Sequence, residues 1–295
     1  MCDLAAWSWA LACPVCSGRL AGAGSLSMRC AGCGGDFPVR AGIPSLVHPS
    51  RRAWADGFGK AYREARLLEG WAPPDAAQAL ALPDHPPPRH PALYWEIRRQ
   101  SLAVLERAIA DSSKKEMAGA ELPLAADLGA GTGWLSYRLA LAGYRSVAID
   151  ASVDDGFGVG AMAPYRHACP GRILALQGDL EHPPLAASAY ALVVFNASLH
   201  YATDLTGTLA RGARALAPGG LLAVMDSPVE RLPRAGHGHG DRHLGRAELD
   251  HALAAAGLRP RWLDVPRSAH WMWHQLKATL RGHERFTFPL VLAEP

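Results

Sequence analysis

The sequence predicts an α/β protein with a doubly wound, mostly parallel seven-stranded sheet of the Rossmann-like type, preceded by a small cysteine-rich ribbon and a helical cap. Three observations predict this architecture. Apolar runs typical of strands alternate with helical patterns after residue 120. A glycine-rich turn joins the first of these strands to the first helix. Two C-x-x-C pairs, beginning at Cys13 and Cys30, lie within the first 50 residues.

The alternating part of the chain defines the sheet. We expect strands at 123–128, 145–150, 172–178, 190–196 and 220–226, with helices at about 134–142, 203–216 and 246–257. The segment Ala217-Pro218-Gly219-Gly220 terminates the helix before the fifth strand. Two more strands, at Arg259 to Pro266 and Arg285 to Ala293, flank a Trp-rich helix at 268–281. Ligands of such a sheet bind outside the carboxyl ends of its strands.

Three domains follow from these patterns: the ribbon at 1–50, a helical cap with a Pro-rich linker at 51–120, and the α/β domain at 121–295. Within the cap, Trp54 to Leu68 and Leu93 to Ala110 carry apolar residues at helical spacing. The prolines between 73 and 91 forbid regular structure there. This region either packs on the following domain as a plain cap or forms a lid over a substrate pocket.

Composition and charge exclude several classes of protein. A net charge of +3 and a pI near 8.6 are too slight to indicate a nucleic-acid footprint. No stretch approaches the roughly 20 apolar residues of a membrane span. The run from Leu4 to Cys13 lacks a basic start, so we expect no export signal and a cytoplasmic protein. Thiols stay reduced in that compartment, so paired cysteines indicate a metal.

The two cysteine pairs predict a structural zinc ion. The expected ligands are the thiolates of Cys13, Cys16, Cys30 and Cys33. Four protein ligands leave no open position for a catalytic water. Few basic residues occur in the ribbon, so a scaffold or a docking surface for a protein partner is favoured over contact with nucleic acid. Cys2 and Cys169 have no partner by spacing and are expected to be plain apolar residues.

The glycine turn at Asp127 to Gly133 predicts a nucleotide-like ligand. Its glycines stand at 129, 131 and 133, and the bulky Trp134 follows where a dinucleotide site would have glycine. A ligand without a pyrophosphate fits this spacing better.

Three acidic residues end adjacent expected strands. Asp127 ends the first strand, Asp150 the second and Asp179 the third, so they converge on one crevice. A carboxylate after the second strand suits a ribose diol. Any one of them alone is explained equally well as a helix N-cap. Three beside a glycine turn favour a binding site.

Residues 121–228 resemble a class I S-adenosylmethionine-dependent methyltransferase of the type 11-like kind. The resemblance rests on the D-x-G-x-G-x-G turn, Asp150, Asp179, the strand from Tyr190 and the segment Leu216-Ala217-Pro218-Gly219-Gly220-Leu221-Leu222. It implies that Asp150 binds the ribose hydroxyls and that Asp179 with Leu180 binds the adenine. The methionine part of S-adenosylmethionine is then held by Asp127, Gly129, Ala130, Gly131 and Gly133, and Asn196 also borders the cofactor.

The N-terminus has a resemblance of its own. The two cysteine pairs, followed by Phe37-Pro38-Val39-Arg40-Ala41-Gly42-Ile43-Pro44, are similar to the small zinc-ribbon activator of tRNA and protein methyltransferases. Ribosomal RNA guanine methyltransferases with an N-terminal zinc finger are similar in layout, although their ligand pattern and linker differ.

The segment Phe195 to Tyr201, after the fourth strand, faces the methyl group in the class that the chain resembles. It contains neither an Asn-Pro-Pro-Tyr-type motif nor a Pro-Cys nucleophile. His200 is the candidate base, with Tyr201 and Asn196 as orienting groups. The ordinary alternative is a histidine that caps or packs a helix. Asp226, at the end of the fifth strand, is a second candidate base.

Two further clusters invite weaker hypotheses. The histidines between His237 and His243 suggest a metal site, which we do not favour over a substrate wall. For Trp271, Trp273 and His274 we favour core packing over an aromatic substrate box.

These patterns together predict methyl transfer from S-adenosylmethionine to an O, N or C atom of a small-molecule acceptor, in specialised metabolism. One alternative is an rRNA or tRNA methyltransferase guided by its zinc ribbon. Another is a non-catalytic protein that binds the cofactor and docks a partner through the ribbon.

Overall fold

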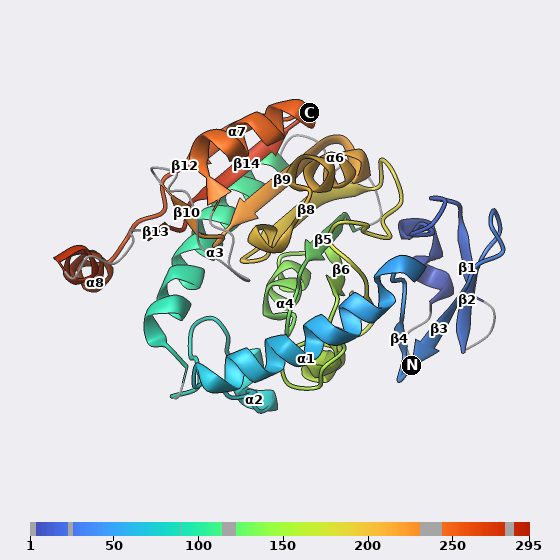
Figure 1. The fold of residues 1–295 in the computed structure, drawn as a ribbon, viewed down its shortest axis with the longest axis horizontal. Coiled ribbons are helices and arrows are strands. Elements are labelled where there is room, and N and C mark those ends of the chain that lie inside the picture. Colours follow the sequence, from blue (N-terminus) through green and yellow to red (C-terminus); the bar gives the residue numbers. More distant parts are fainter. Residues whose placement is uncertain (1–3, 23–25, 89, 114–121, 231–243, 281–285) are drawn as a thin grey trace.

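The computed structural model describes residues 4–22, 26–88, 90–113, 122–230, 244–280 and 286–295. Its centre is a seven-stranded sheet in the order β12-β14-β9-β8-β5-β6-β7 (Figure 1). The parallel strands are β5 (Leu124–Leu128), β6 (Arg145–Asp150), β7 (Ile173–Gln177), β8 (Tyr190–Asn196) and β9 (Leu216–Met225). The antiparallel edge contains β14 (Leu290–Glu294) and β12 (Arg259–Leu263). The predicted fold class is confirmed.

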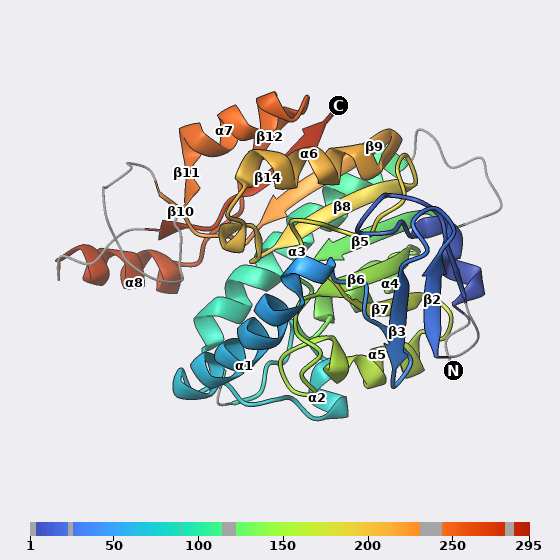
Figure 2. The same cartoon turned by 45° about the vertical axis from the view of Figure 1, so that its right-hand side comes forward.

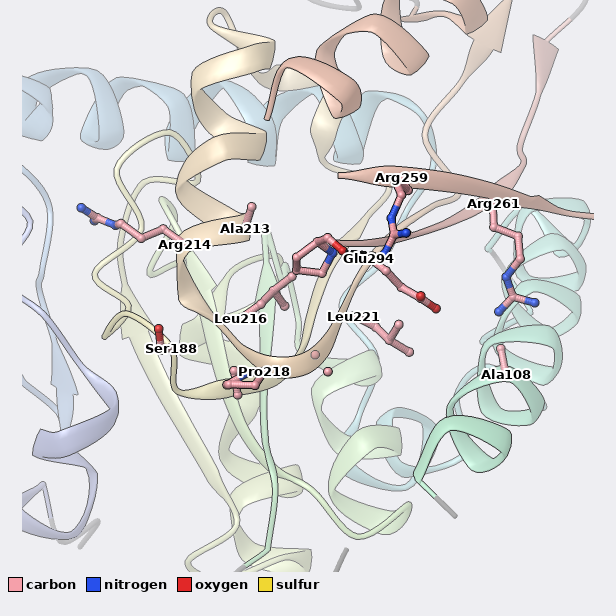
Figure 3. Close-up of a pocket in the computed structure, with 14 residues that line it drawn as sticks. Ala108, Ser188, Ala213, Arg214, Leu216, Pro218, Leu221, Arg259, Arg261 and Glu294 are labelled. Atoms are coloured by element: carbon pink, nitrogen blue, oxygen red, sulfur yellow. Dashed lines mark hydrogen bonds between the residues drawn. The ribbon is translucent and has the colours of Figure 1, made fainter. Parts of the chain in front are cut away.

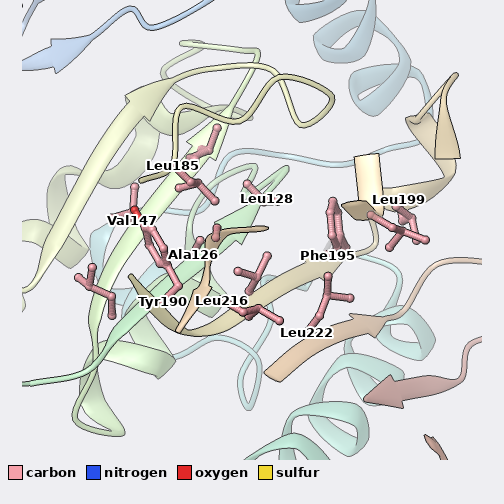
Figure 4. Packing of buried hydrophobic residues seen from close by; sticks show 14 of the residues in the cluster. Ala126, Leu128, Val147, Leu185, Tyr190, Phe195, Leu199, Leu216 and Leu222 are labelled. Carbon is pink, nitrogen blue, oxygen red and sulfur yellow. The ribbon is translucent and has the colours of Figure 1, made fainter. Parts of the chain in front are cut away.

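Helices cover both faces of this sheet, because its strands are apolar on both sides. One face packs against α6 (Leu205–Ala215) and α7 (Arg246–Ala255). Figure 4 shows the core on this side, where Leu128, Tyr190 and Phe195 lie among aliphatic side chains. The other face packs against α3 (Ala92–Ser113), α4 (Trp134–Leu141) and α5 (Ala163–Ala168), the last preceded by the 3₁₀ turn η3 (Val159–Met162).

The N-terminal ribbon is an antiparallel sheet that packs against the α/β domain (Figure 2). Its elements are η1 (Ala5–Ala10), β1 (Leu20–Gly22), β2 (Ser27–Cys30), β3 (Asp36–Arg40) and β4 (Ile43–Pro44). Just after β4, Ser45 forms a parallel bridge with Gln177 of β7. The Tyr190 hydroxyl donates to the Ala10 carbonyl at 2.6 Å, and Trp7 is buried. The ribbon therefore shares a core with the sheet.

The cap begins with η2 (Pro49–Arg51) and continues into α1 (Arg52–Leu68). The prediction that the Pro-rich segment has no regular structure was wrong, because α2 (Ala76–Leu80) lies inside it. Asp75 caps this helix by accepting from the Gln78 amide, and the Gln78 side chain accepts in return from the Asp75 amide. A complete capping box offsets the neighbouring prolines, which lie outside the helix.

The C-terminal part differs from expectation in two respects. A small sheet of β10 (Val229–Glu230), β11 (Leu244–Gly245) and β13 (Phe286–Thr287) was not predicted. The helix α8 (Ala269–Leu280) projects from the body (Figure 1). On this helix, 55% of Trp273 is exposed. The expected core packing was therefore wrong for Trp273 and His274, which are both exposed, whereas the Trp271 ring lies 5.6 Å from that of Phe288, centroid to centroid. The hypothesis for His237 to His243 lies outside the described residues.

Within the part of the chain that the structure describes, no helix combines the length and the apolar character needed to cross a bilayer.

Candidate functional site

The glycine turn after β5 has a backbone that only glycine adopts readily. Gly129, Gly131 and Gly133 all have positive φ, at 75°, 53° and 85°. A Cβ at Gly129 would lie 2.3 Å from the Ser198 Cβ, and a Cβ at Gly133 would lie 2.3 Å from the Met162 Cε. The turn therefore packs tightly against η3 and the segment after β8 while its outer side borders a cavity.

Asp150 fixes this turn from the end of β6. One carboxylate oxygen accepts from the Gly131 amide at 2.8 Å, and the other accepts from the Ser152 amide at 2.8 Å. Burial raises the pKa of Asp150 to about 6, although the hydrogen bonds from the two amides act to lower it. Each carboxylate oxygen keeps a second lone pair, so the group can also accept from a ligand hydroxyl.

Asp127 lies behind the turn and is fully buried. The Ser136 hydroxyl of α4 donates to its Oδ2 at 2.8 Å, which ties β5 to the helix. Burial raises the pKa of Asp127 to about 7. The structure places this carboxyl within the fold, whereas Gly129, Ala130 and Gly131 line the cavity.

Asp179 is held by an arginine from the cap. The Arg51 Nε lies 2.7 Å from its Oδ2, and Arg51 Nη2 lies 3.4 Å from Glu181. Only 1% of the Asp179 side chain is exposed, and Asp179 is not among the lining residues of either cavity described below. Leu180, the next residue, does line one. No local sequence pattern indicates the role of Arg51, because its partner lies 128 residues away.

Two neighbouring cavities with shared lining residues border the turn. The larger has a volume of about 520 Å³ and lies between the carboxyl ends of the strands and the cap. The smaller, of about 50 Å³, is lined by Asp150, Ala151, Gly178 and Leu180 and is covered by α1. Tyr62, Gly129, Gly131, Ala197 and Tyr201 line both. This arrangement gives one long crevice along the ends of β6, β5, β8 and β9.

An aromatic row on α1 forms the roof of the narrow part. Trp54, Phe58 and Tyr62 are spaced by four residues and share one helix face. Their rings stack at centroid distances of 5.2 and 5.8 Å, and Phe58 meets Tyr201 edge-on at 5.6 Å. The spacing was visible in the sequence, but the helical pattern was assigned only to a cap.

The predicted acceptor residues lie together at the far end of the crevice. Asn196 ends β8, and His200 and Tyr201 belong to η4 (Leu199–Tyr201); all three line the larger cavity. The His200 and Tyr201 rings are 4.2 Å apart. The Asn196 Oδ1 is buried and has no hydrogen-bond partner among the described residues. Asp226 also lines this cavity, and burial raises its pKa.

The cap supplies wall residues that sequence reasoning missed. Helix α1, the Pro-rich segment and α3 contribute Tyr62, Arg66, Glu69, Trp71, Pro74, Leu82, His90, Pro91, Tyr94, Trp95 and Arg98. The Pro-rich segment thus both packs on the domain and lines the cavity, so the two interpretations offered for it do not exclude each other. Spacings of four residues at Tyr62 and Arg66, and at Tyr94 and Arg98, are the signal that could have found this wall.

A third cavity, of about 850 Å³, lies at the other end of the strands (Figure 3). It borders the start of β9, and its charged residues are Arg214, Arg259, Arg261 and Glu294. The glycine turn and the acids that end β5, β6 and β7 lie at the opposite edge. We therefore assign the functional site to the crevice beneath the cap.

The four cysteines of the ribbon form a separate cluster. The sulfur atoms of Cys13, Cys16, Cys30 and Cys33 all lie within 4.8 Å of one another. Amides of Gly32 and Cys33 point at the Cys30 sulfur at 3.3 and 3.5 Å, and such bonds lower the pKa of Cys30 to about 6. A Cβ on Gly18 would lie 3.1 Å from the Cys16 sulfur. Cys169 is buried away from this cluster, as expected, and Cys2 lies outside the described residues.

The fold and the crevice are typical of one kind of α/β domain. A parallel sheet with an antiparallel edge, a glycine turn after β5 and a carboxylate ending β6 are the features of a class I, Rossmann-like methyltransferase domain. Residues 126–224 match the family model described as a methyltransferase domain. This part of the chain is therefore similar to a methyltransferase domain, and the predicted resemblance to S-adenosylmethionine-dependent methyltransferases is confirmed.

Known proteins resemble the chain to different extents. Over 143 residues it is 31% identical to malonyl-[acyl-carrier protein] O-methyltransferase of Hahella chejuensis, a match that covers 45% of this chain. The chain spans about half the length of that relative, with 50% covered. Geranyl diphosphate C-methyltransferase from Streptomyces coelicolor A3(2) has a TM-score of 0.50 at 16% identity, covering 82% of this chain and 97% of that chain. A geranyl diphosphate methyltransferase in complex with GPP and sinefungin has a TM-score of 0.50 at 17% identity. This match covers 65% of this chain and 78% of that chain. Both structural likenesses concern the fold.

Proposed function

We propose that this protein transfers a methyl group from S-adenosylmethionine to an O, N or C atom of a small-molecule acceptor. The observation that carries the proposal is the single crevice that runs from Asp150, past the glycine turn, to His200. In this proposal the Asp150 carboxylate at one end accepts from the ribose hydroxyls, and His200 at the other end is the candidate base.

The residues of the crevice fit the cofactor. Glycines 129 and 131 leave the turn without side chains on its cavity side, and Asp150 has spare lone pairs for a ribose diol. Leu180 and Ala151 offer apolar contacts to an adenine beneath the aromatic row of α1. When bound, the cofactor supplies a methyl group on a positively charged sulfur. The chain's part is to align the acceptor and exclude water, which can account for much of the rate of such transfers.

Asp179 has a positioning role in this proposal. Because its carboxylate is engaged by Arg51, it fixes the start of α1 and hence the roof over the adenine position. In this proposal Leu180, and not Asp179, contacts the cofactor at the end of β7.

His200 is proposed as the base for an acceptor that must lose a proton, with Tyr201 and Asn196 orienting that acceptor. The buried Asn196 Oδ1 has no partner among the described residues, so it is available to accept from an acceptor N–H or O–H. Asp226 is the second candidate base.

A small-molecule acceptor is favoured by the enclosure of the site. A volume of about 520 Å³ lies within the range of roughly 300–1,000 Å³ typical of small-ligand pockets. Its walls come from α1, the Pro-rich segment and α3, and only 8% of the candidate base His200 is exposed.

We further propose a structural zinc ion on the four cysteines. Zinc–sulfur bonds of about 2.3 Å in a tetrahedron separate the sulfurs by about 3.8 Å. The Sγ distances of 3.7 Å for Cys13–Cys33 and 3.4 Å for Cys16–Cys30 fit such an ion.

The affinity for S-adenosylhomocysteine is expected to fall about tenfold between pH 7 and pH 5. Hydroxyl donors favour the charged form of Asp150, whose pKa in the free protein is raised to about 6. Binding is therefore full above that pH and is lost as the pH falls through it. Isothermal titration calorimetry of the wild type and of Asp150→Asn checks this. A pH step that persists in Asp150→Asn would assign the titration elsewhere, with Asp127 the next candidate.

Methyl transfer itself is tested with radiolabelled S-adenosylmethionine and fractionated cell extract. We expect label in solvent-extractable small molecules, and we expect His200→Asn to reduce it by about 10²- to 10⁴-fold while cofactor affinity changes little. Label in RNA would support the ribbon-guided RNA methyltransferase instead. Cofactor binding without transfer to any fraction would support the non-catalytic alternative.

A further inference from the structure

The acceptor end of the larger cavity combines flat aromatic walls with two arginines. The ring centroid of Trp71 lies 6.4 Å from that of Tyr94 and 6.3 Å from that of Trp95. Phe288 continues the wall at 6.4 Å from Tyr94. Such a slot suits a planar or apolar ligand.

Arg98 enters this slot from α3. Its guanidinium lies 4.9 Å from the Trp95 ring centroid and 5.5 Å from that of Trp71. Its Nη1 is buried and has no hydrogen-bond partner among the described residues. An unsatisfied buried donor is costly, and a charged one more so. This atom therefore requires a partner that the described part of the chain does not supply.

Arg66 lines the same cavity and, like Arg98, has a buried nitrogen without a hydrogen-bond partner among the described residues. Its Nη1 pairs with Glu69 at 3.0 Å, but its Nε is buried and lacks a partner among the described residues. Asp226 acts electrostatically on Arg98, yet one of its oxygens accepts from Ser101 at 2.6 Å. The cavity thus keeps unused donor capacity on two guanidinium groups.

We propose that the acceptor carries an anionic group, a carboxylate or a phosphate, which Arg98 binds while the aromatic walls hold a flat apolar body. This inference rests on the proposed function and names its acceptor class. Arginine is suited to the task because its planar fork matches a carboxylate or phosphate with two parallel bonds.

The position of Arg98 favours the acceptor over the carboxylate of the cofactor. Its charged neighbour Asp226 ends β9, and β8 separates β9 from β5 and its glycine turn. Asp150, the proposed ribose ligand, lies one strand further away, on β6. Arg98 lines the larger cavity and Asp150 the smaller one, and Tyr62 lines both.

The test uses the full chain saturated with S-adenosylhomocysteine and three probes in calorimetry: benzoate, its neutral analogue benzamide, and phenyl phosphate. We expect benzoate or phenyl phosphate to bind at least tenfold more tightly than benzamide, and the preferred one identifies the anion. Arg98→Gln should abolish this preference. The matched control is Arg99→Gln, which changes the exposed neighbour on the same helix and should leave the preference intact.

Equal binding of the three probes to the wild type would overturn the proposal, and this result does not depend on any variant folding. A tenfold loss of S-adenosylhomocysteine affinity in Arg98→Gln, with the probe preference retained, would also overturn it and assign Arg98 to the cofactor. Failure of the proposed function is recognised separately, because the wild type would then either bind no S-adenosylhomocysteine or transfer no label from S-adenosylmethionine to any fraction. The probe titrations without the cofactor product would still report on the anion site.

Discussion

Replacement of Gly129 by alanine is expected to lower the affinity for S-adenosylhomocysteine by at least about 100-fold and to destabilise the fold by about 2–4 kcal/mol. The new Cβ would lie 2.3 Å from the Ser198 Cβ, and Ser198 is held by its own bond to the Leu128 carbonyl at 2.5 Å. The backbone at Gly129 or at Ser198 would have to shift to relieve this contact, and either shift would move the turn that borders the cavity. Calorimetry and chemical denaturation measure the two effects.

Gly171→Ala is the matched control for this change. Gly171 has the same φ of 75° as Gly129, but its Cβ would meet nothing within 4 Å. It should therefore show only the cost of a left-handed backbone, about 1–2 kcal/mol, with unchanged cofactor affinity. If Gly129→Ala behaved like this control, the packing of the turn against Ser198 would not be what shapes the site.

Loss of the zinc ligands is expected to have the second large effect. Cys30→Ser should reduce bound zinc from about one ion per chain to near zero and lower the melting temperature by about 10 °C or more, because bound metal contributes directly to folding in so small a sheet. Elemental analysis and thermal denaturation measure these changes. Cys169→Ser, a buried cysteine outside the cluster, should keep its zinc.

The effect of zinc loss should extend to the cofactor site. The ribbon continues through Ser45, which bonds Gln177, into Arg51, which holds Asp179 and Glu181. A loosened ribbon would release this arginine and the start of α1, so we expect the affinity for S-adenosylhomocysteine to fall about tenfold. A metal-free protein with full stability and full affinity would contradict both the zinc assignment and the coupling.

The sequence predicted the sheet and the cofactor side of the site because those features are local. Strand periodicity, the glycine spacing and the acid that ends β6 each lie within a few residues, and Asp150 does bond the Gly131 amide. The cluster of Cys13, Cys16, Cys30 and Cys33 was predicted for the same reason, since the cysteines of such clusters keep a fixed spacing.

What the sequence could not predict depends on contacts between distant segments. Arg51 pairs with Asp179 across 128 residues, and no local pattern distinguishes that arginine from its neighbour Arg52. The acceptor wall likewise joins α1, the Pro-rich segment, α3 and Phe288. The helix in the Pro-rich segment was missed because a capping box at Asp75 outweighed the prolines around it. For Trp273, apolar character suggested burial where the fold leaves it exposed.

The central claim is that the crevice along β6, β5 and β8 binds S-adenosylmethionine. Calorimetric titration of the intact chain with S-adenosylhomocysteine and, in parallel, NAD⁺ tests it most directly. We expect one molecule of S-adenosylhomocysteine per chain with a dissociation constant in the micromolar range, no binding of NAD⁺, and a loss of at least about tenfold in affinity for Asp150→Ala. Binding of NAD⁺ without S-adenosylhomocysteine, or an unchanged affinity in Asp150→Ala, would contradict the claim.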